Sequence, residues 1–193
     1  MINDIGMEGV FCLSCAKPLN ANLVSNKYCS CFSTFSKTDG LAVMQINLQH
    51  SKLATAELSR RLDLSKTSTI VLCTEPWTHK GKLPGLTPYN ITVTAKESVV
   101  RAAIISTKDV RMWPVDKFCN GDVAVTAVQH STGTLLMMSW YWDINLNDIN
   151  PLVEEVVEAC EARQLPLVIG ADTNAHSPVW GCPDSNPRGL RLE

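Results

Sequence analysis

Polar side chains of the kinds that serve phosphate chemistry stand at the ends of predicted strands. Asn47 ends the first such strand, Glu75 ends the second, and Asp172 ends the last, with Asn174 two positions further along. Tyr141 stands near the end of a central strand. Catalytic side chains in α/β folds gather at strand ends, where the loops leave a crevice. The distribution therefore indicates one candidate site.

The residue types suit hydrolysis of a phosphodiester with the help of a metal ion. A carboxylate such as Glu75 can ligate Mg²⁺, which prefers oxygen ligands. On extended backbone, Asp172 and Asn174 would point the same way. One side chain would orient or deprotonate a water, while the other donates a hydrogen bond to a phosphate oxygen.

Each of these residues also has a purely structural explanation. Glu75 suits a solvated loop, and residues 172–174 suit a turn or a helix cap. Tyr141 suits packing between its tryptophan neighbours. His50 and His176 suit hydrogen-bonded surface positions. Residue types and spacing alone thus indicate a metal-dependent hydrolase and nothing narrower.

An alternation of apolar strands with helices and loops would position these residues from Leu41 onward. The expected strands cover residues 41–47, 69–75, 91–95, 98–106, 122–129, 134–142 and 165–172. A turn at residues 131–133 suggests a hairpin. Strands mixed with helices predict an α/β layered sandwich of two mixed sheets flanked by helices.

Two amphipathic helices are expected within this alternation. Ser51 is placed to cap the first helix. Its apolar face would carry Leu53, Ala54, Leu58 and Leu62. Asn147 or Asp148 is placed to cap the second helix, which would run to Cys160.

Residues 1–38 differ from the domain expected over residues 39–193. They have frequent Cys, Ser and Asn and no sustained periodicity, which indicates an irregular leader. Four of its cysteines form a C-x-x-C and a C-x-C pair, namely Cys12, Cys15, Cys29 and Cys31. Four thiolates can hold a tetrahedral Zn²⁺, but incidental cysteines remain an alternative because the second pair is tighter than usual.

Composition restricts the class of protein. Hydrophobic residues make up 45% of the 193 residues and charged residues 19%, which predicts a globular fold. The formal net charge of -2 argues against a protein that coats DNA by charge alone, so DNA contacts must be local. No apolar run would span a membrane, and the acidic N-terminus does not suit a signal peptide. An intracellular protein with reduced thiols at Cys73, Cys119, Cys160 and Cys182 is expected.

Taken together, four segments resemble the endonuclease/exonuclease/phosphatase superfamily, and more closely its branch in non-LTR (Jockey-like) retrotransposons. They read VMQINLQHSK, VLCTEPWTHKGKLPGL, LLMMSWYWD and VIGADTNAHSPVWGCPDSNPRGLRLE, in that order. The resemblance runs from Leu41 to Glu193. The last segment, with its G-x-D-x-N-A-H and W-G motifs, is the most specific.

The resemblance implies a role for each matching residue. Glu75 would hold a divalent metal, Mg²⁺ or Mn²⁺, with Asn47 close by as a further ligand or catalytic residue. Tyr141 would contact the scissile phosphate. Asp172 would align or activate the attacking water, and Asn174 would stabilise the transition state.

The resemblance also implies partners and a reaction. His176 and Trp180 would shape a loop beside the site. The family nicks a DNA strand, and the resulting 3′-hydroxyl primes reverse transcription by a domain further along the polyprotein. A functional protein of this kind would work on DNA in the nucleus and not at a membrane.

One departure from the family limits these expectations. The family has a later Asp-containing strand and a final Ser-Asp-His segment, and nothing after Arg188 and Gly189 matches them. A fold truncated at the C-terminus, with exposed sheet edges, is therefore expected. Poor or absent nicking by this polypeptide alone would follow.

Two other functions stay open. The first is a catalytically inactive nucleic-acid-binding or interaction remnant, in which Glu75 and Asp172 are relics. The second keeps the superfamily but acts on a phosphorylated small molecule or lipid. The loops at residues 75–77 and 175–181 argue against the second, because they resemble the retrotransposon branch.

Overall fold

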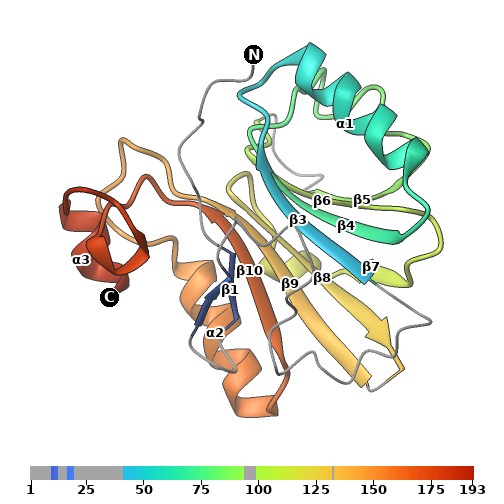
Figure 1. The fold of residues 1–193 in the computed structure, drawn as a ribbon. Helices are drawn as coiled ribbons and strands as arrows, with labels where there is room; N and C mark the ends of the chain where they lie inside the picture. Colours follow the sequence, from blue (N-terminus) through green and yellow to red (C-terminus); the bar gives the residue numbers. More distant parts are fainter. Residues whose placement is uncertain (1–9, 13–16, 20–40, 94–98, 132) are drawn as a thin grey trace.

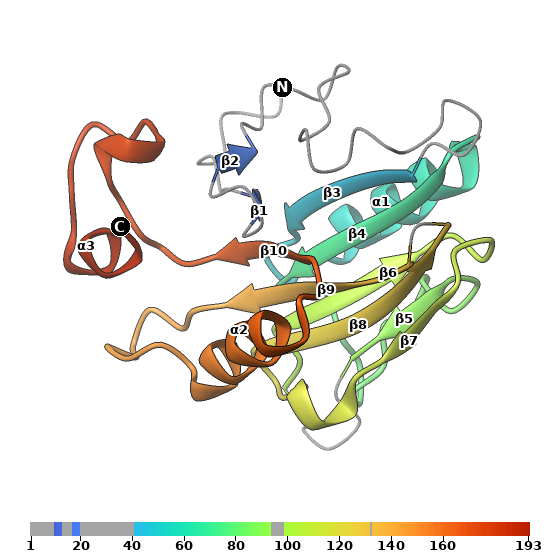
Figure 2. The same cartoon turned by 90° about the horizontal axis from the view of Figure 1, so that it is seen from below.

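The computed structural model describes residues 10–12, 17–19, 41–93, 99–131 and 133–193, which form two facing β-sheets with helices outside (Figure 1). Helix α1 (Lys52–Leu64) lies outside a four-stranded sheet of order β3-β4-β6-β5. Helix α2 (Pro151–Arg163) lies outside a six-stranded sheet of order β2-β1-β10-β9-β8-β7 (Figure 2). The expected α/β sandwich of two mixed sheets is confirmed.

The four-stranded sheet carries the first two strand ends of the candidate site. Its strands are β3 (Leu41–Asn47), β4 (Ser68–Thr74), β6 (Ala102–Ser106) and β5 (Asn90–Thr92). Strands β3 and β4 are parallel, with Asn47 beside Thr74. Strand β6 is antiparallel to β4, so Ala102 lies beside Thr74 and the start of β6 meets the same edge.

The six-stranded sheet carries the other two strand ends. Its strands are β1 (Val10–Cys12), β2 (Lys17–Leu19), β7 (Met112–Pro114), β8 (Val123–His130), β9 (Gly133–Tyr141) and β10 (Leu167–Asp172). Strands β8 and β9 form the expected hairpin. Strands β9 and β10 are parallel, which sets Tyr141 beside Asp172.

Helices α1 and α2 confirm one expectation and correct two others. Ser51 caps α1, because its side chain accepts a hydrogen bond from the Ala54 backbone N–H at 3.2 Å. Leu53, expected on the buried face of α1, is 81% exposed. Helix α2 is capped by Asn150, not by Asn147 or Asp148. Pro151 explains the shift, since its fixed φ suits the first helical position and disfavours helix in the residue before it.

Part of the N-terminal leader belongs to the sheet. Strand β1 pairs antiparallel with β10, with Val10 beside Gly170, and β2 pairs with β1. Two short described segments of the expected leader thus form strands at one edge of this sheet. Strand β10 has neighbours on both sides, whereas β3 has β4 alone among the described residues, and its Val43 and Met44 are each 39% exposed.

Short elements that the sequence did not predict complete the fold. They are β7, the 3₁₀ helices η3 (Asp116–Phe118) and η4 (Pro178–Trp180), and helix α3 (Pro187–Leu192). None has the length from which a periodicity can be recognised. In Figures 1 and 2, α3 lies beyond the carboxyl end of β10.

The core between the sheets brings β10 very close to β4. Apolar side chains such as Leu72, Ile104 and Met137 fill this layer. A Cβ on Gly170 would lie 2.7 Å from the Cβ of Leu72, so a larger residue could not occupy this position without a shift. Since Gly170 lies two residues before Asp172, the sheets approach each other closely at the strand ends.

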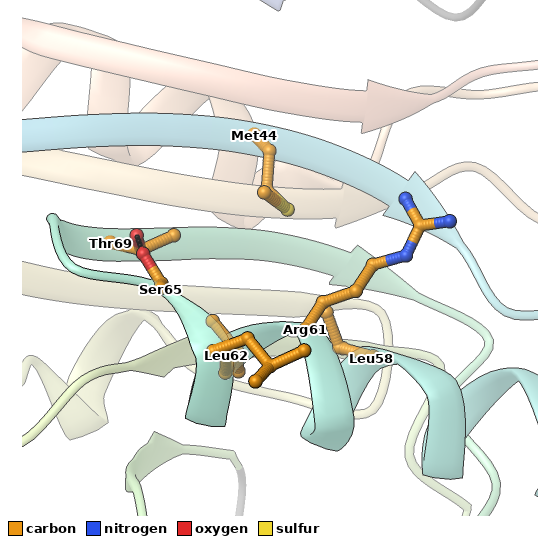
Figure 3. A pocket seen from close by; sticks show the side chains of 7 residues that line it. Met44, Leu58, Arg61, Leu62, Ser65 and Thr69 are labelled. Atoms are coloured by element: carbon orange, nitrogen blue, oxygen red, sulfur yellow. Dashed lines mark hydrogen bonds between the residues drawn. The ribbon is translucent and has the colours of Figure 1, made fainter.

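A half-open pocket of about 280 Å³ lies between α1 and the outer strand β3, away from these strand ends (Figure 3). Its lining residues are Met44, Leu58, Arg61, Leu62, Leu64, Ser65 and Thr69. Thr69 is at the opposite end of β4 from Glu75. Among the described residues, no helix is long and apolar enough to cross a membrane.

Candidate active site

The strand register brings four of the expected residues to one edge of the sandwich. Asn47 ends β3, and Glu75 follows the last residue of β4, which is Asn47's neighbour. Tyr141 and Asp172 end β9 and β10 and lie beside each other. Both pairs stand at the carboxyl ends of parallel strands, as expected for a site of an α/β fold.

A hydrogen bond between the sheets joins the two pairs. The Asn47 Nδ2 amide donates to Oδ2 of Asp172 at 2.5 Å. The Asn47 Oδ1 atom accepts from the Gln49 backbone N–H at 2.7 Å, and the two bonds together fix the orientation of the amide. Asp172 is 4% exposed, so the donor satisfies a carboxylate that water hardly reaches.

Glu75 is held by its backbone in an unusual conformation. Its φ is +46°, in the left-handed region that a non-glycine residue rarely adopts. Its N–H donates to the carbonyl of Arg101 at 2.8 Å, and its carbonyl accepts from the N–H of His50 at 2.7 Å. Such strain clusters at functional sites, where the surrounding structure enforces it.

Tyr141 is surrounded by acidic groups. Burial, together with the negative charges of Glu75, Asp172 and Asp143 and a hydrogen bond with Glu75, raises the pKa of Tyr141 to about 12. Its hydroxyl therefore keeps its proton at neutral pH and can act as a hydrogen-bond donor.

Arg101 is a residue of this site that sequence reasoning missed. Its guanidinium lies 5.4 Å from the centroid of the Tyr141 ring and bonds Asp122 at 2.5 Å and also Asp143. Burial opposes its charge, but the bonds to Asp122 and Asp143 outweigh burial and raise the pKa of Arg101. The sequence offered one signal for Arg101, a charged residue directly before the apolar run of β6. Arg101 lies near Glu75 because β6 pairs antiparallel with β4.

The segment after β10 does not have the expected geometry. Strand β10 ends at Asp172, and Asn174 has a left-handed φ of +51°, so the two side chains do not share one extended strand. Asn174 is exposed, and its Nδ2 lies 3.5 Å from the carbonyl of Trp142. The premise that the D-x-N pair points one way on extended backbone is wrong.

His176 and Trp180 lie in the loop after β10 and make contacts within that loop and with its C-terminal continuation. His176 Nδ1 lies 3.0 Å from Oδ1 of Asp184, and its backbone N–H donates to Oδ1 of Asn186. Trp180 Nε1 donates to the carbonyl of Ala175 at 3.2 Å. These contacts are of the loop-shaping kind that the family resemblance implies for both residues.

Arg188 ties this loop to the end of β9. Its guanidinium donates to four backbone carbonyls, those of Trp142, Asp143, Leu146 and Thr173, and lies 4.5 Å from the Trp142 ring centroid. Gly189 allows close approach, because a Cβ there would lie 1.8 Å from the carbonyl oxygen of His176. The Arg-Gly pair thus holds the two loops that flank Tyr141 and Asp172.

Oxygen atoms at the strand-end edge of the sandwich could act as ligands of a metal ion. The Glu75 carboxylate is 20% exposed and suits an oxygen-preferring divalent ion that retains several waters. The hydroxyl of Thr74, the preceding residue, is buried with no hydrogen-bond partner among the described residues, so one buried polar group beside Glu75 is left unsatisfied. The donor set fits a partly hydrated metal, although no cluster of three or more His, Cys, Asp or Glu occurs in the described part.

The cysteines divide into two groups. Cys73, Cys119, Cys160 and Cys182 are free thiols, and burial is the main cause that raises the pKa of the first three. Of the four cysteines considered as a possible zinc site, Cys12 lies in β1, and Cys15, Cys29 and Cys31 lie outside the described residues.

Comparison with known proteins agrees with this architecture. A solved structure, the "Endonuclease domain of TRAS1, a telomere-specific non-LTR retrotransposon", is similar at 27% sequence identity and a TM-score of 0.61. The similarity covers 78% of this chain and 66% of that one, so this chain spans just under two thirds of the solved domain. No protein-family model and no curated protein matches the chain.

The fold and the strand-end site define a two-sheet α/β domain with polar residues gathered at one edge of the sandwich. Within this class, the expected resemblance to the endonuclease domains of non-LTR retrotransposons is confirmed. The chain has the architecture of such a domain.

Proposed function

We propose that this domain is a metal-dependent endonuclease of a non-LTR retrotransposon, which hydrolyses a phosphodiester bond in DNA. The observation that carries the proposal is the hydrogen bond between Asn47 and Asp172. It joins the sheet that carries Glu75 to the sheet that carries Tyr141, so that one substrate phosphate can meet both. The similar solved domain supports the nuclease class.

The residues divide the chemistry among them. Glu75, with Asn47 beside it, would hold a divalent ion, Mg²⁺ or Mn²⁺, which supplies charge to the phosphate. Asp172, positioned by Asn47, orients and deprotonates the attacking water. Tyr141 remains protonated and donates a hydrogen bond to a phosphate oxygen, which stabilises the developing negative charge. Asn174, exposed beside them, donates to the same phosphate group.

Support for DNA as the substrate comes from groups beside the site. The Lys52 ammonium lies 5.3 Å from the centroid of the Trp77 ring, in the loop after Glu75. A cation next to an aromatic ring offers contacts to both a phosphate and a base. Since the net charge is -2, such local contacts must hold the DNA. The nick would leave a 3′-hydroxyl for a reverse transcriptase domain, and the setting would be the nucleus.

The test is nicking of supercoiled plasmid by the 193-residue chain under single-turnover conditions, with Mg²⁺ or Mn²⁺. We expect slow nicking, because no Ser-Asp-His segment occurs among its residues. Asp172→Ala and Glu75→Ala should each lower the rate by at least about 100-fold. Glu154→Ala, on the exposed face of α2, is the matched control and should not change it.

The binding of DNA, measured on the same samples, separates the competing functions. If the chain binds DNA but shows no nicking that depends on Glu75, the domain is a nucleic-acid-binding module and the catalytic proposal falls. Loss of nicking in the Glu154→Ala control as well would mean that the activity does not come from this site.

A further inference from the structure

His50 lies beside the candidate metal ligand Glu75 and has no role in the mechanism above. Its Nε2 atom is 3.5 Å from Oε1 of Glu75, and its Nδ1 atom is 3.3 Å from the backbone carbonyl of Pro76. We propose that His50 is a second protein ligand of the ion held by Glu75, so that the site offers a nitrogen and an oxygen donor. This inference rests on the proposed function.

The contacts of the two His50 ring nitrogens are those expected of a histidine that binds a metal ion. When Nδ1 carries the proton and donates to the carbonyl of Pro76, Nε2 presents a lone pair towards Glu75. A lone pair and a carboxylate oxygen cannot bond each other, but a cation between them satisfies both. A histidine that ligates a metal almost always donates its other N–H to a carboxylate or backbone carbonyl, which is the arrangement of His50.

The backbone conformation around His50 and Glu75 holds the imidazole ring beside the carboxylate. Gln49 and His50 have left-handed φ angles of +48° and +51°, and Glu75 has +46°. Hydrogen bonds tie the two turns together, from the His50 N–H to the Glu75 carbonyl at 2.7 Å and from the Leu48 N–H to the Thr74 carbonyl at 2.9 Å. Non-glycine residues adopt such angles at an energetic cost, and strain of this kind clusters at functional sites.

Solvent access at the pair suits an ion that keeps part of its water shell. The His50 side chain is 53% exposed and that of Glu75 is 20% exposed. The two donors can thus supply part of the coordination, while water or a phosphate oxygen supplies the rest.

The donor set determines which ions are preferred. Imidazole nitrogen suits transition ions such as Co²⁺, Ni²⁺ and Zn²⁺ better than Mg²⁺, for which oxygen donors are preferred. The site should therefore bind Co²⁺ much more tightly than Mg²⁺, and the difference should depend on His50.

The experiment measures Co²⁺ and Mg²⁺ affinity of the chain by calorimetry, without DNA and without an activity readout. His50→Asn is the main variant, because asparagine tolerates the left-handed backbone and exchanges the nitrogen donor for an oxygen donor. We expect Co²⁺ affinity to fall about 10–100-fold and Mg²⁺ affinity to change less than about threefold. His79→Ala, at an exposed histidine in the loop after Glu75, is the matched control and should change neither.

Pulsed electron paramagnetic resonance of the Mn²⁺-loaded chain provides a second readout. The imidazole nitrogen should couple to the ion in the parent chain and in His79→Ala, and the coupling should vanish in His50→Asn. No nitrogen coupling, or an equal loss of Co²⁺ and Mg²⁺ affinity in His50→Asn, would overturn the assignment of His50 as a ligand.

Glu75→Ala separates this inference from the proposed function. If it abolishes binding of both ions while His50→Asn alters neither, His50 is only an ion-pair partner and the metal site stands. If both ions bind Glu75→Ala as well as they bind the parent, the metal site itself is wrong. Thermal melts of each variant show whether it is folded.

Discussion

At the residue scale, the site depends on side chains whose properties are set by their neighbours. Tyr141 would be an ordinary packing aromatic beside Trp140 and Trp142, but its hydroxyl lies among carboxylates and its ring under the Arg101 guanidinium. In the proposed mechanism, this protonated hydroxyl is the group that donates a hydrogen bond to the substrate phosphate. Its titration is therefore a direct measure of the site.

We predict that Tyr141→Phe removes a high-pH phase of unfolding. The pKa of Tyr141 is about 12 in the folded chain and about 10 when unfolded, so the folded state holds the proton more tightly. The associated stability is fully present below pH 10 and is lost as the pH rises towards 12. Denaturant unfolding at pH 9, 10, 11 and 12 should show a steeper loss for the parent than for the variant.

Spectroscopy supplies the control for this titration. The difference in tyrosinate absorbance between the parent chain and Tyr141→Phe should titrate near pH 12. A difference spectrum that titrates near pH 10 would mean that the carboxylates and burial do not act on this hydroxyl. Tyr89→Phe, on a tyrosine whose hydroxyl bonds Ser59 and Asp63 of α1, should leave the Tyr141 phase unchanged.

At the element scale, the loops after β9 and β10 are held by one arginine. Arg188 donates to four backbone carbonyls of these two loops. The loops carry Asp143, which bonds Arg101, and Asn174, so the loss of Arg188 affects both sides of the site. Arg188 thus links the loop after β9 to the loop after β10.

We predict that Arg188→Ala lowers the free energy of unfolding by about 2–3 kcal/mol, because several charge-assisted hydrogen bonds are lost. Limited proteolysis should cut the variant first within residues 143–148 or 173–186. Arg163→Ala, at the exposed end of α2, should cost less than about 0.5 kcal/mol. Equal stability of the two variants would show that Arg188 does not hold the loops.

At the scale of the whole molecule, the two sheets are joined at both their core and their functional edge. The interior layer packs Gly170 against Leu72, and two residues further along β10 the Asn47–Asp172 bond links the sheets again. The site is therefore not built on either sheet alone. Its geometry depends on how the two sheets pack.

We predict that Asn47→Ala lowers the free energy of unfolding by about 1–3 kcal/mol, because the buried Asp172 carboxylate loses its donor. Nicking should fall with it, since Asp172 is no longer positioned. Denaturant unfolding of Asn147→Ala, at an exposed loop asparagine, provides the comparison and should change by less than about 0.5 kcal/mol. If Asn47→Ala were as stable as this control, the bond would not couple the sheets.

Much of the fold followed from local patterns in the chain. The expected strands at 41–47 and 69–75 agree with β3 and β4 to within one residue, and Ser51 caps α1 as expected. Apolar runs and a capping side chain are local signals, so they could be recognised without knowledge of contacts. The short β7 and the strands of the leader were missed because three-residue segments carry no periodicity.

By itself, the sequence determined which side chains could do chemistry and that they stand at strand ends: Asn47, Glu75, Tyr141 and Asp172. Only the tertiary structure decided that Asn47 reaches across to Asp172, that Arg101 stands over Tyr141, and that Asn174 leaves the extended strand. The physical reason is that strand pairing and sheet packing join residues distant in the chain, and no local pattern encodes which of them meet.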